Sequence, residues 1–179
     1  MKKKEFPQLE TERLFLRKLE ISDWESISYL RSDKIINQFV KRENADTKEK
    51  AIKFIEKTKL KIKDNQLFYW SITLKEDNKM IGSICLWNFS KDEKIAEIGY
   101  DLDPKFQNKG IMNESMIAIL KFGFQILNLE KIEAFTQKQN KNSISLLIKN
   151  SFCLNEKRND QENIDNIIFE LNRPAANNG

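Results

Sequence analysis

The sequence has 179 residues, of which 40% are apolar, and its 31 basic and 27 acidic residues leave a net charge of +4. This length fits one domain with a sizeable core, and the mild, interspersed charge excludes the concentrated basic stripe of a nucleic-acid-binding protein. Histidine is absent. Ser-His-Asp and Cys-His catalysis and imidazole metal sites are therefore excluded, and acid–base chemistry has to use carboxylates, Tyr, Lys or water.

No stretch approaches the roughly 20 consecutive apolar residues of a membrane span. The opening "MKKKEFPQ" lacks the apolar segment of a signal peptide. We therefore expect a soluble cytoplasmic protein without nucleic-acid, membrane or metal partners. The two cysteines, Cys85 and Cys153, lie in apolar runs and are expected to be core residues.

The first elements along the chain are a strand and two helices. "RLFLRKL", Arg13 to Leu19, alternates polar and apolar residues as a half-buried strand does. "SDWESISYL" predicts a helix that Ser22 or Asp23 can cap. A second helix is expected from about Thr47 to Ile62.

The middle of the chain changes to the period of strands. Three runs rich in β-branched and aromatic residues, "LFYWSITL", "MIGSICLW" and "IAEIGYDL", are joined by the short connections "KEDNK" and "NFSKDEK". They predict a three-stranded antiparallel meander.

The last part alternates helices and strands. A helix follows to about Leu127, then "KIEAFT" as a strand, "NSISLLIKN" as a short helix, and "SFCLNEK" and "NIIFEL" as two strands. We predict a single domain over residues 1–173 and a disordered tail at 174–179.

The segment "FQNKGIMNES" joins the third strand of the meander to the helix after it, and it contains one of only five glycines. A strand that runs into a helix start through glycine can point several free backbone N–H groups at one spot, which suits phosphate. Gly110 would let the backbone approach such a ligand. Alternatively, Gly110 only makes a tight connection.

Several motifs resemble those of one family. "QNKGIM" is similar to the acetyl-CoA loop of the GNAT N-acetyltransferase superfamily. "LETERLFLRKLEISDWESI", "EIGYDLDPKFQNKGIMNES" and "NKNSISLLIKNSF" resemble, in order and spacing, the RimJ/RimL branch of ribosomal-protein N-terminal acetyltransferases.

This resemblance implies a mixed α/β (α+β) GNAT fold, with a mostly antiparallel sheet of about seven strands that is split between strands 4 and 5. It implies transfer of acetyl from acetyl-CoA to a primary amine by direct attack, without metal, in a monomer or homodimer. A peptide or protein N-terminus is the expected acceptor. A small amine (polyamine, amino acid or antibiotic) and a non-catalytic acyl-CoA sensor stay open as alternatives.

The resemblance also assigns the site of acetyl-CoA. The pyrophosphate would lie on the loop around Gly110, the pantetheine arm beside Asp101 and Asp103, and the thioester near Asn140 and Ser143. The expected cofactor-binding residues are Asp101, Asp103, Gln107, Asn108, Lys109, Gly110, Ile111, Met112, Asn113, Asn140 and Ser143. A backbone N–H near 101–103 would stabilise the oxyanion.

The chain departs from the family pattern at three positions. Met112 replaces a small residue, so its side chain has to point away from the phosphate. Ser151 replaces a glycine before Phe152, which we expect to be harmless. Leu147 stands where many members have the tyrosine that protonates the leaving thiolate.

Two catalytic residues are predicted. Glu97 shares one strand face with Gly99 and Asp101 and lies among apolar residues, so we expect burial, a raised pKa and the role of general base. It could instead be a solvent-facing strand residue. Ser143 would bind the thiolate or carbonyl, or would only cap a helix. Further candidates, each with an ordinary surface or core alternative, are Glu162 on the substrate side and Trp70, Trp87, Phe89 and Phe122 around an acceptor pocket.

Overall fold

A computed structural model describes residues 6–175. The helices are α1 (Trp24–Ser32), α2 (Lys48–Lys63), α3 (Ile111–Gln125) and α4 (Lys141–Lys149), with short 3-10 turns η1 (Ile21–Asp23) and η2 (Pro104–Phe106). The strands are β1 (Leu9–Glu10), β2 (Leu14–Lys18), β3 (Leu67–Leu74), β4 (Asp77–Trp87), β5 (Ile95–Leu102), β6 (Lys131–Gln137), β7 (Cys153–Leu154) and β8 (Asn166–Asn172).

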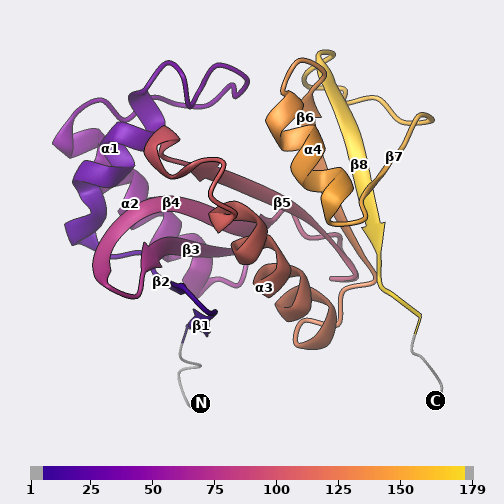
Figure 1. Cartoon of the computed structure of the whole chain (residues 1–179), viewed down its shortest axis with the longest axis horizontal. Helices are drawn as coiled ribbons and strands as arrows, with labels where there is room; N and C mark the ends of the chain where they lie inside the picture. The colour runs from indigo at the N-terminus through magenta and orange to yellow at the C-terminus, as the bar shows by residue number, and fades with distance from the viewer. Residues whose placement is uncertain (1–5, 176–179) are drawn as a thin grey trace.

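All strands form one sheet in the order β1-β2-β3-β4-β5-β6-β8-β7 (Figure 1). Every neighbouring pair is antiparallel except β5 and β6, which are parallel. These two strands pair only from Ile95 to Glu97 on β5, and they diverge beyond Glu97. The predicted mixed α/β fold and the split between the fourth and fifth predicted strands are thus confirmed.

Helices cover both faces of the sheet through two separate apolar clusters. On one face Ile27 of α1 and Ile55 of α2 belong to a cluster with Tyr69 of β3. On the other face α3 packs over the larger cluster, which includes Trp70, and α4 lies beside β6 and β8 (Figure 1). The gap between β5 and β6 therefore lies between the part of the sheet that α1, α2 and α3 cover and the part beside α4.

The structure corrects the sequence-based boundaries at three places. Strand β1 adds an eighth strand, and β4 begins at Asp77, so most of the expected loop "KEDNK" belongs to the hairpin. "SFCLNEK" contributes only the two residues of β7. The prediction that Cys153 is a core residue was wrong, because β7 is the outermost strand and leaves this side chain exposed.

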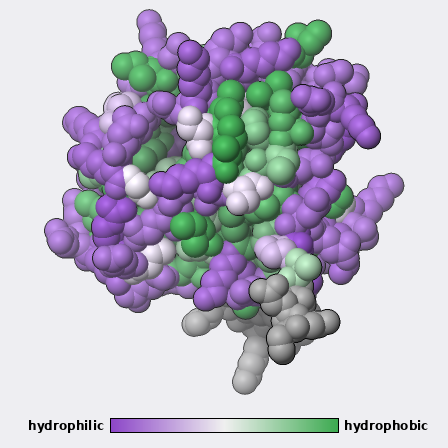
Figure 2. Space-filling model, turned by 45° about the vertical axis from the view of Figure 1, so that its right-hand side comes forward, coloured by the Kyte–Doolittle hydropathy of each residue, from purple (hydrophilic) through white to green (hydrophobic). Residues whose placement is uncertain are grey.

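Two predictions fall partly outside the described residues: the disordered tail at 174–179 and the absence of a signal peptide in the first eight residues. Within residues 6–175 no helix is both long and apolar enough to cross a membrane. The face of the molecule drawn in Figure 2 is mostly hydrophilic. The same residues contain no group of three or more His, Cys, Asp or Glu side chains that could hold a metal ion.

Candidate active site

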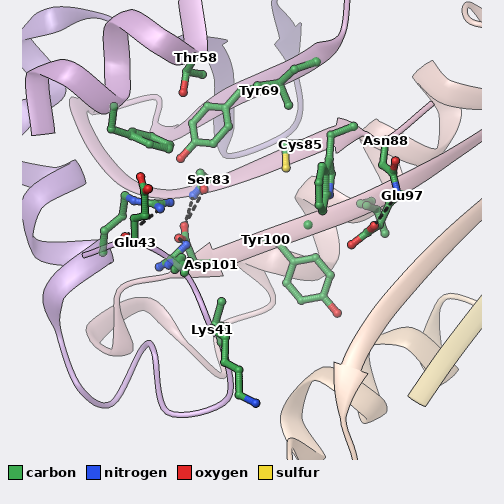
Figure 3. A pocket seen from close by; sticks show the side chains of 18 of the residues that line it. Lys41, Glu43, Thr58, Tyr69, Ser83, Cys85, Asn88, Glu97, Tyr100 and Asp101 are labelled. Atoms are coloured by element: carbon green, nitrogen blue, oxygen red, sulfur yellow. Dashed lines mark hydrogen bonds and ion pairs between the residues drawn. The ribbon is translucent and has the colours of Figure 1, made fainter. Parts of the chain in front are cut away.

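A pocket of about 1050 Å³ lies at the split between β5 and β6. Its walls come from β3 to β6, helix α2, the 39–45 segment and the start of α4 (Figure 3). The predicted residues Glu97, Asp101, Asn140 and Ser143 all line it, whereas Asp103 and the loop 107–113 do not.

The pleat of β5 places different chemistry on the two sides of the split. Strand alternation places Glu97 and Asp101 on the face of β5 that also carries Cys85 of β4, toward α1 and α2, and Tyr100 on the opposite face. Figure 3 shows Asp101 directed toward Ser83 and Tyr100 pointing away from them. Gly99 lies between Glu97 and Asp101 on the same face. A Cβ there would lie 3.2 Å from the Cys85 sulfur, so a larger residue would crowd this wall of the pocket. A reactant in the split can therefore meet a carboxylate from one side and a hydroxyl from the other.

Glu97 is half-buried, as the strand pattern predicted. The pKa of Glu97 is raised to about 7, mainly by burial, against a hydrogen bond that Asn88 donates at 3.4 Å and with smaller contributions from the carboxylates of Asp160, Glu133 and Glu162. A carboxyl group with this pKa is half ionised at neutral pH, so it can accept a proton there and release it again.

Asp101 is held by its neighbours rather than free to bind a ligand. Its carboxylate pairs with Arg42 at 2.7 Å and accepts hydrogen bonds from the backbone N–H and hydroxyl of Ser83. The pair ties the 39–45 segment to β5. The side chain of Asp101 is therefore not available for the pantetheine arm.

The amide of Asp103 is also occupied, since it donates to the carbonyl of Ile81 at 2.9 Å. The expected oxyanion donor cannot be this group. Alternate amides of a strand point to opposite edges, so those of Leu102 and Tyr100 face the split edge. The side chain of Asp103 caps η2 by accepting from the N–H of Lys105.

Tyr100 and Ser143 form a hydroxyl pair that the sequence did not reveal. The two oxygens lie 2.8 Å apart on the α4 side of the pocket, and burial raises the pKa of Tyr100 to about 12. Asn140, not Ser143, caps α4, with its side chain accepting from the Ser143 N–H. Leu147 is fully buried. A tyrosine is thus present near the predicted thioester position, although it comes from β5 rather than α4.

The loop before α3 has the predicted geometry of an anion site. Gly110 is the residue that precedes α3, in the left-handed conformation with φ +76°. The first amides of α3, from Ile111 to Asn113, have no acceptor within the helix, and no other backbone carbonyl in residues 6–175 accepts from them. They point where the positive end of the helix dipole favours an anion.

Arg13 and Glu114 hold this loop, and neither was predicted. The Arg13 side chain donates to Glu114 at 2.7 Å and to the carbonyl of Lys109 at 2.9 Å, so β2 fixes both the loop and the first turn of α3. These contacts join residues about a hundred positions apart in the sequence, and no local pattern could have indicated them.

The remaining candidates have mostly structural positions. Met112 packs against the core, so its side chain leaves the amides open. Trp70 and Phe122 are core residues and Phe89 packs against the core, whereas Trp87 lines the pocket and is 42% exposed. Cys85 also lines the pocket. Glu162 does not line it and acts only through its charge on Glu97.

Comparisons with known proteins agree with this geometry. The chain is 30% identical over 147 residues to the uncharacterized N-acetyltransferase YoaA of Bacillus subtilis, covering 82% of this chain and 83% of that protein. Its fold matches the ribosomal-protein-S5-alanine acetyltransferase from Vibrio fischeri, with a TM-score of 0.80, 23% identity and coverage of 94% and 97%. It also matches RimL, a ribosomal alpha-N-protein acetyltransferase solved with coenzyme A, with a TM-score of 0.79, 18% identity and coverage of 93% and 97%.

The match to a family model extends through the whole site, from the residue before β2 to the residue before β7. Residues 13–152 fit the model of the acetyltransferase (GNAT) domain, which is more than half of the chain. The chain belongs to the GNAT acetyltransferase family.

Proposed function

We propose that this N-acetyltransferase transfers the acetyl group of acetyl-CoA to the α-amino group of a peptide or protein N-terminus. The observation that carries the acceptor assignment is the size of the pocket. At about 1050 Å³ it slightly exceeds the roughly 300–1,000 Å³ that small-molecule sites occupy, which supports an acceptor larger than a small amine. The fold of ribosomal-protein acetyltransferases and the RimJ/RimL-like motifs give the assignment further support.

The free amides of α3 fit the pyrophosphate of coenzyme A. Gly110 lets the backbone approach it closely, and the charge of Arg13 lies beside the same loop. The pantetheine arm would then follow the split edge of β5. Bound there, acetyl-CoA supplies an acetyl group that is already activated as a thioester.

Glu97 is the proposed general base. Most alkyl amines are protonated at neutral pH, so the amine needs to lose a proton before it can attack. Glu97 takes this proton through water on the α1 and α2 side of the split. The amides of Leu102 and Tyr100, at the split edge, are placed to donate to the thioester oxygen.

Tyr100 and Ser143 are proposed to stabilise the leaving sulfur from the opposite side. The Tyr100 hydroxyl, with a pKa of about 12, stays protonated and can donate to Ser143, which then donates to the sulfur. An alkyl thiol has a pKa of about 8.5, so a hydrogen bond is favoured over complete proton transfer from Tyr100.

A matched acceptor set tests the proposal. One peptide carries a free N-terminus and an internal Lys, its control is the same peptide with a blocked N-terminus, and spermidine and an amino-containing antibiotic complete the set. Thiol release gives the rate and mass spectrometry gives the acetylated position. We expect acetylation of the free α-amino group and none of the blocked peptide.

Each other outcome has a defined meaning. Acetylation of the antibiotic or spermidine alone would replace the peptide assignment with a small-amine one. No thiol release from any acceptor, together with a rise in melting temperature on adding acetyl-CoA, would favour a non-catalytic acyl-CoA sensor.

A further inference from the structure

The wall of the pocket formed by α2 and the 39–45 segment carries an excess of positive charge. Seven cationic side chains line the pocket, against three carboxylates: Arg31, Lys41, Arg42, Lys50, Lys53, Lys57 and Lys61 against Glu43, Glu97 and Asp101. The chain as a whole is nearly balanced, with 31 basic and 27 acidic residues, so the excess is local to this pocket.

Some of these cations are compensated within the protein. Arg42 pairs with Asp101, and Lys50 pairs with Asp46 at 2.6 Å. Arg31 lies over the ring of Phe54 at 4.0 Å. Those three side chains are therefore accounted for by the fold.

Lys53, Lys57 and Lys61 are not compensated in this way. They recur every four residues, so they form one ridge on the exposed side of α2. Within residues 6–175 none of the three forms an ion pair with a carboxylate; those found join other side chains. Figure 3 shows Thr58, from the same helix, pointing into the pocket above Asp101.

The length of this ridge matches a short peptide. The eight residue steps from Lys53 to Lys61 extend about 12 Å along the helix at ~1.5 Å per residue. An extended peptide covers about the same distance with three or four residues at ~3.3 Å each. A row of unpaired ammonium groups attracts carboxylates, and it repels a polycation such as spermidine.

We propose that the acceptor is an acidic N-terminus, with Asp or Glu side chains in the few residues after the acetylated amine binding Lys53, Lys57 and Lys61. This inference rests on the proposed function, since it names the kind of peptide that the same pocket accepts. Lys41, at the other end of the pocket in Figure 3, extends the cationic surface toward the rest of the peptide.

Three peptides that differ only in charge test the inference. Each begins with Ala, continues with three Glu, three Gln or three Arg residues, and ends in the same uncharged tail. We expect kcat/KM for thiol release to be highest for the Glu peptide and lowest for the Arg peptide, with about a ten-fold difference between Glu and Gln for three exposed charge pairs. The difference should shrink as salt is added.

Substitutions on α2 provide the decisive arm. In the triple variant Lys53→Gln, Lys57→Gln, Lys61→Gln, the ratio between the Glu and Gln peptides should fall close to one. Reversal of the three charges to Glu should make the Arg peptide the better substrate, a gain that misfolding cannot produce. The matched control neutralises three exposed lysines outside the pocket, Lys79, Lys91 and Lys121, and should keep the wild-type ratio.

The possible failures are distinguishable. Equal rates for the three peptides would overturn the acidic acceptor and leave the peptide assignment intact. Acetylation of small phosphorylated or carboxylated amines only, lost in the lysine variant, would overturn the peptide and keep the anionic acceptor. Acetylation of spermidine alone, or of no amine at all, would overturn both.

Discussion

Glu97 and Glu133 lie opposite each other as the last partners in the register of β5 and β6, and Arg158 binds only the second. Two carboxylates on one face of the sheet repel each other, and this repulsion is one reason why the pKa of Glu97 is raised. The split of the sheet begins directly after this pair. The pair of carboxylates at the start of the split therefore also contributes to the raised pKa of Glu97, the proposed base.

Replacement Glu97→Gln should lower kcat by about 10²- to 10⁴-fold at neutral pH, the usual contribution of a positioned base. The wild-type rate should rise with pH through about 7, where Glu97 loses its proton. At high pH the amine deprotonates unaided, so part of the deficit should vanish. A pH–rate series for both proteins measures this, and a deficit that stays constant to high pH would assign Glu97 a structural role.

The same replacement should stabilise the protein at high pH. The folded-state pKa of Glu97, about 7, lies above its ordinary value of 4.5, so the folded protein binds the proton more tightly than the unfolded chain. This favourable contribution is complete below about pH 4.5 and is lost as pH rises through about 7. Between pH 4 and pH 8 the difference in free energy of unfolding between Glu97→Gln and the wild type should therefore shift by about 1–2 kcal/mol in favour of the variant, with allowance for partial exposure.

Denaturant unfolding at several pH values measures this gain. The exposed Glu76→Gln is the matched control and should show no comparable trend with pH. A flat difference between Glu97→Gln and the wild type would mean that the carboxylate of Glu97 is not desolvated.

Replacement Arg158→Gln should raise the pKa of Glu97 further, because it removes the cation that neutralises Glu133. The midpoint of the pH–rate curve should move upward by on the order of half a unit. The neighbouring Lys157→Gln removes the same charge from an exposed side chain and should leave the midpoint in place. Equal midpoints in all three proteins would show that Arg158 supports the loop and not the electrostatics.

Replacement Gly110→Val should abolish the stabilisation by acetyl-CoA. A β-branched residue is strained at φ +76°, and its Cβ would approach the Arg13 side chain at 3.3 Å. At 100 times its Kd a ligand adds about 2.7 kcal/mol, which corresponds to a rise in melting temperature of roughly 5–10 °C for a chain of this size. Gly110→Asn is the control, because Asn tolerates this backbone conformation and should keep more of the rise. An undiminished rise in the Val variant would place the pyrophosphate elsewhere.

Replacement Ser151→Gly should stabilise the protein by about 0.5–1 kcal/mol, since a serine in the left-handed region is strained by more than the extra chain entropy of glycine. Ser151 has φ +65°, so the departure from the family's glycine is tolerated at some cost, not harmless. The comparison is Ser145→Gly in the exposed face of α4, which should destabilise by a similar amount. Chemical denaturation of both variants would show whether their signs differ.

The sequence predicted what depends on neighbouring residues. Hydrophobic periodicity located β5 and α3, glycine marked the start of α3, and strand alternation placed Glu97 on one face of its strand with Asp101. Contacts between distant segments were not predictable in this way. Tyr100 approaches Ser143 from 43 positions away, and it does so only because the sheet splits. Likewise, the apolar run around Cys153 could not reveal that its strand would be the outermost one.

The split has a further consequence for how the sheet meets other molecules. Unpaired strand edges invite pairing with another chain, and this can lead to aggregation. Here the outermost strands, β1 and β7, are only two residues long and offer little template. The longer unpaired stretches, on β5 and β6, lie at the centre of the sheet between covering helices, where the two strands converge on Glu97. An inserted strand needs about 4.8 Å of separation from each neighbour. The space between β5 and β6 just beyond Glu97 should therefore be too narrow for a strand of another protein. A thin ligand with amides of its own can bond to the same backbone groups. These unpaired groups of β5 and β6 can therefore bind the ligand, whereas a β-strand of another protein cannot pair with them.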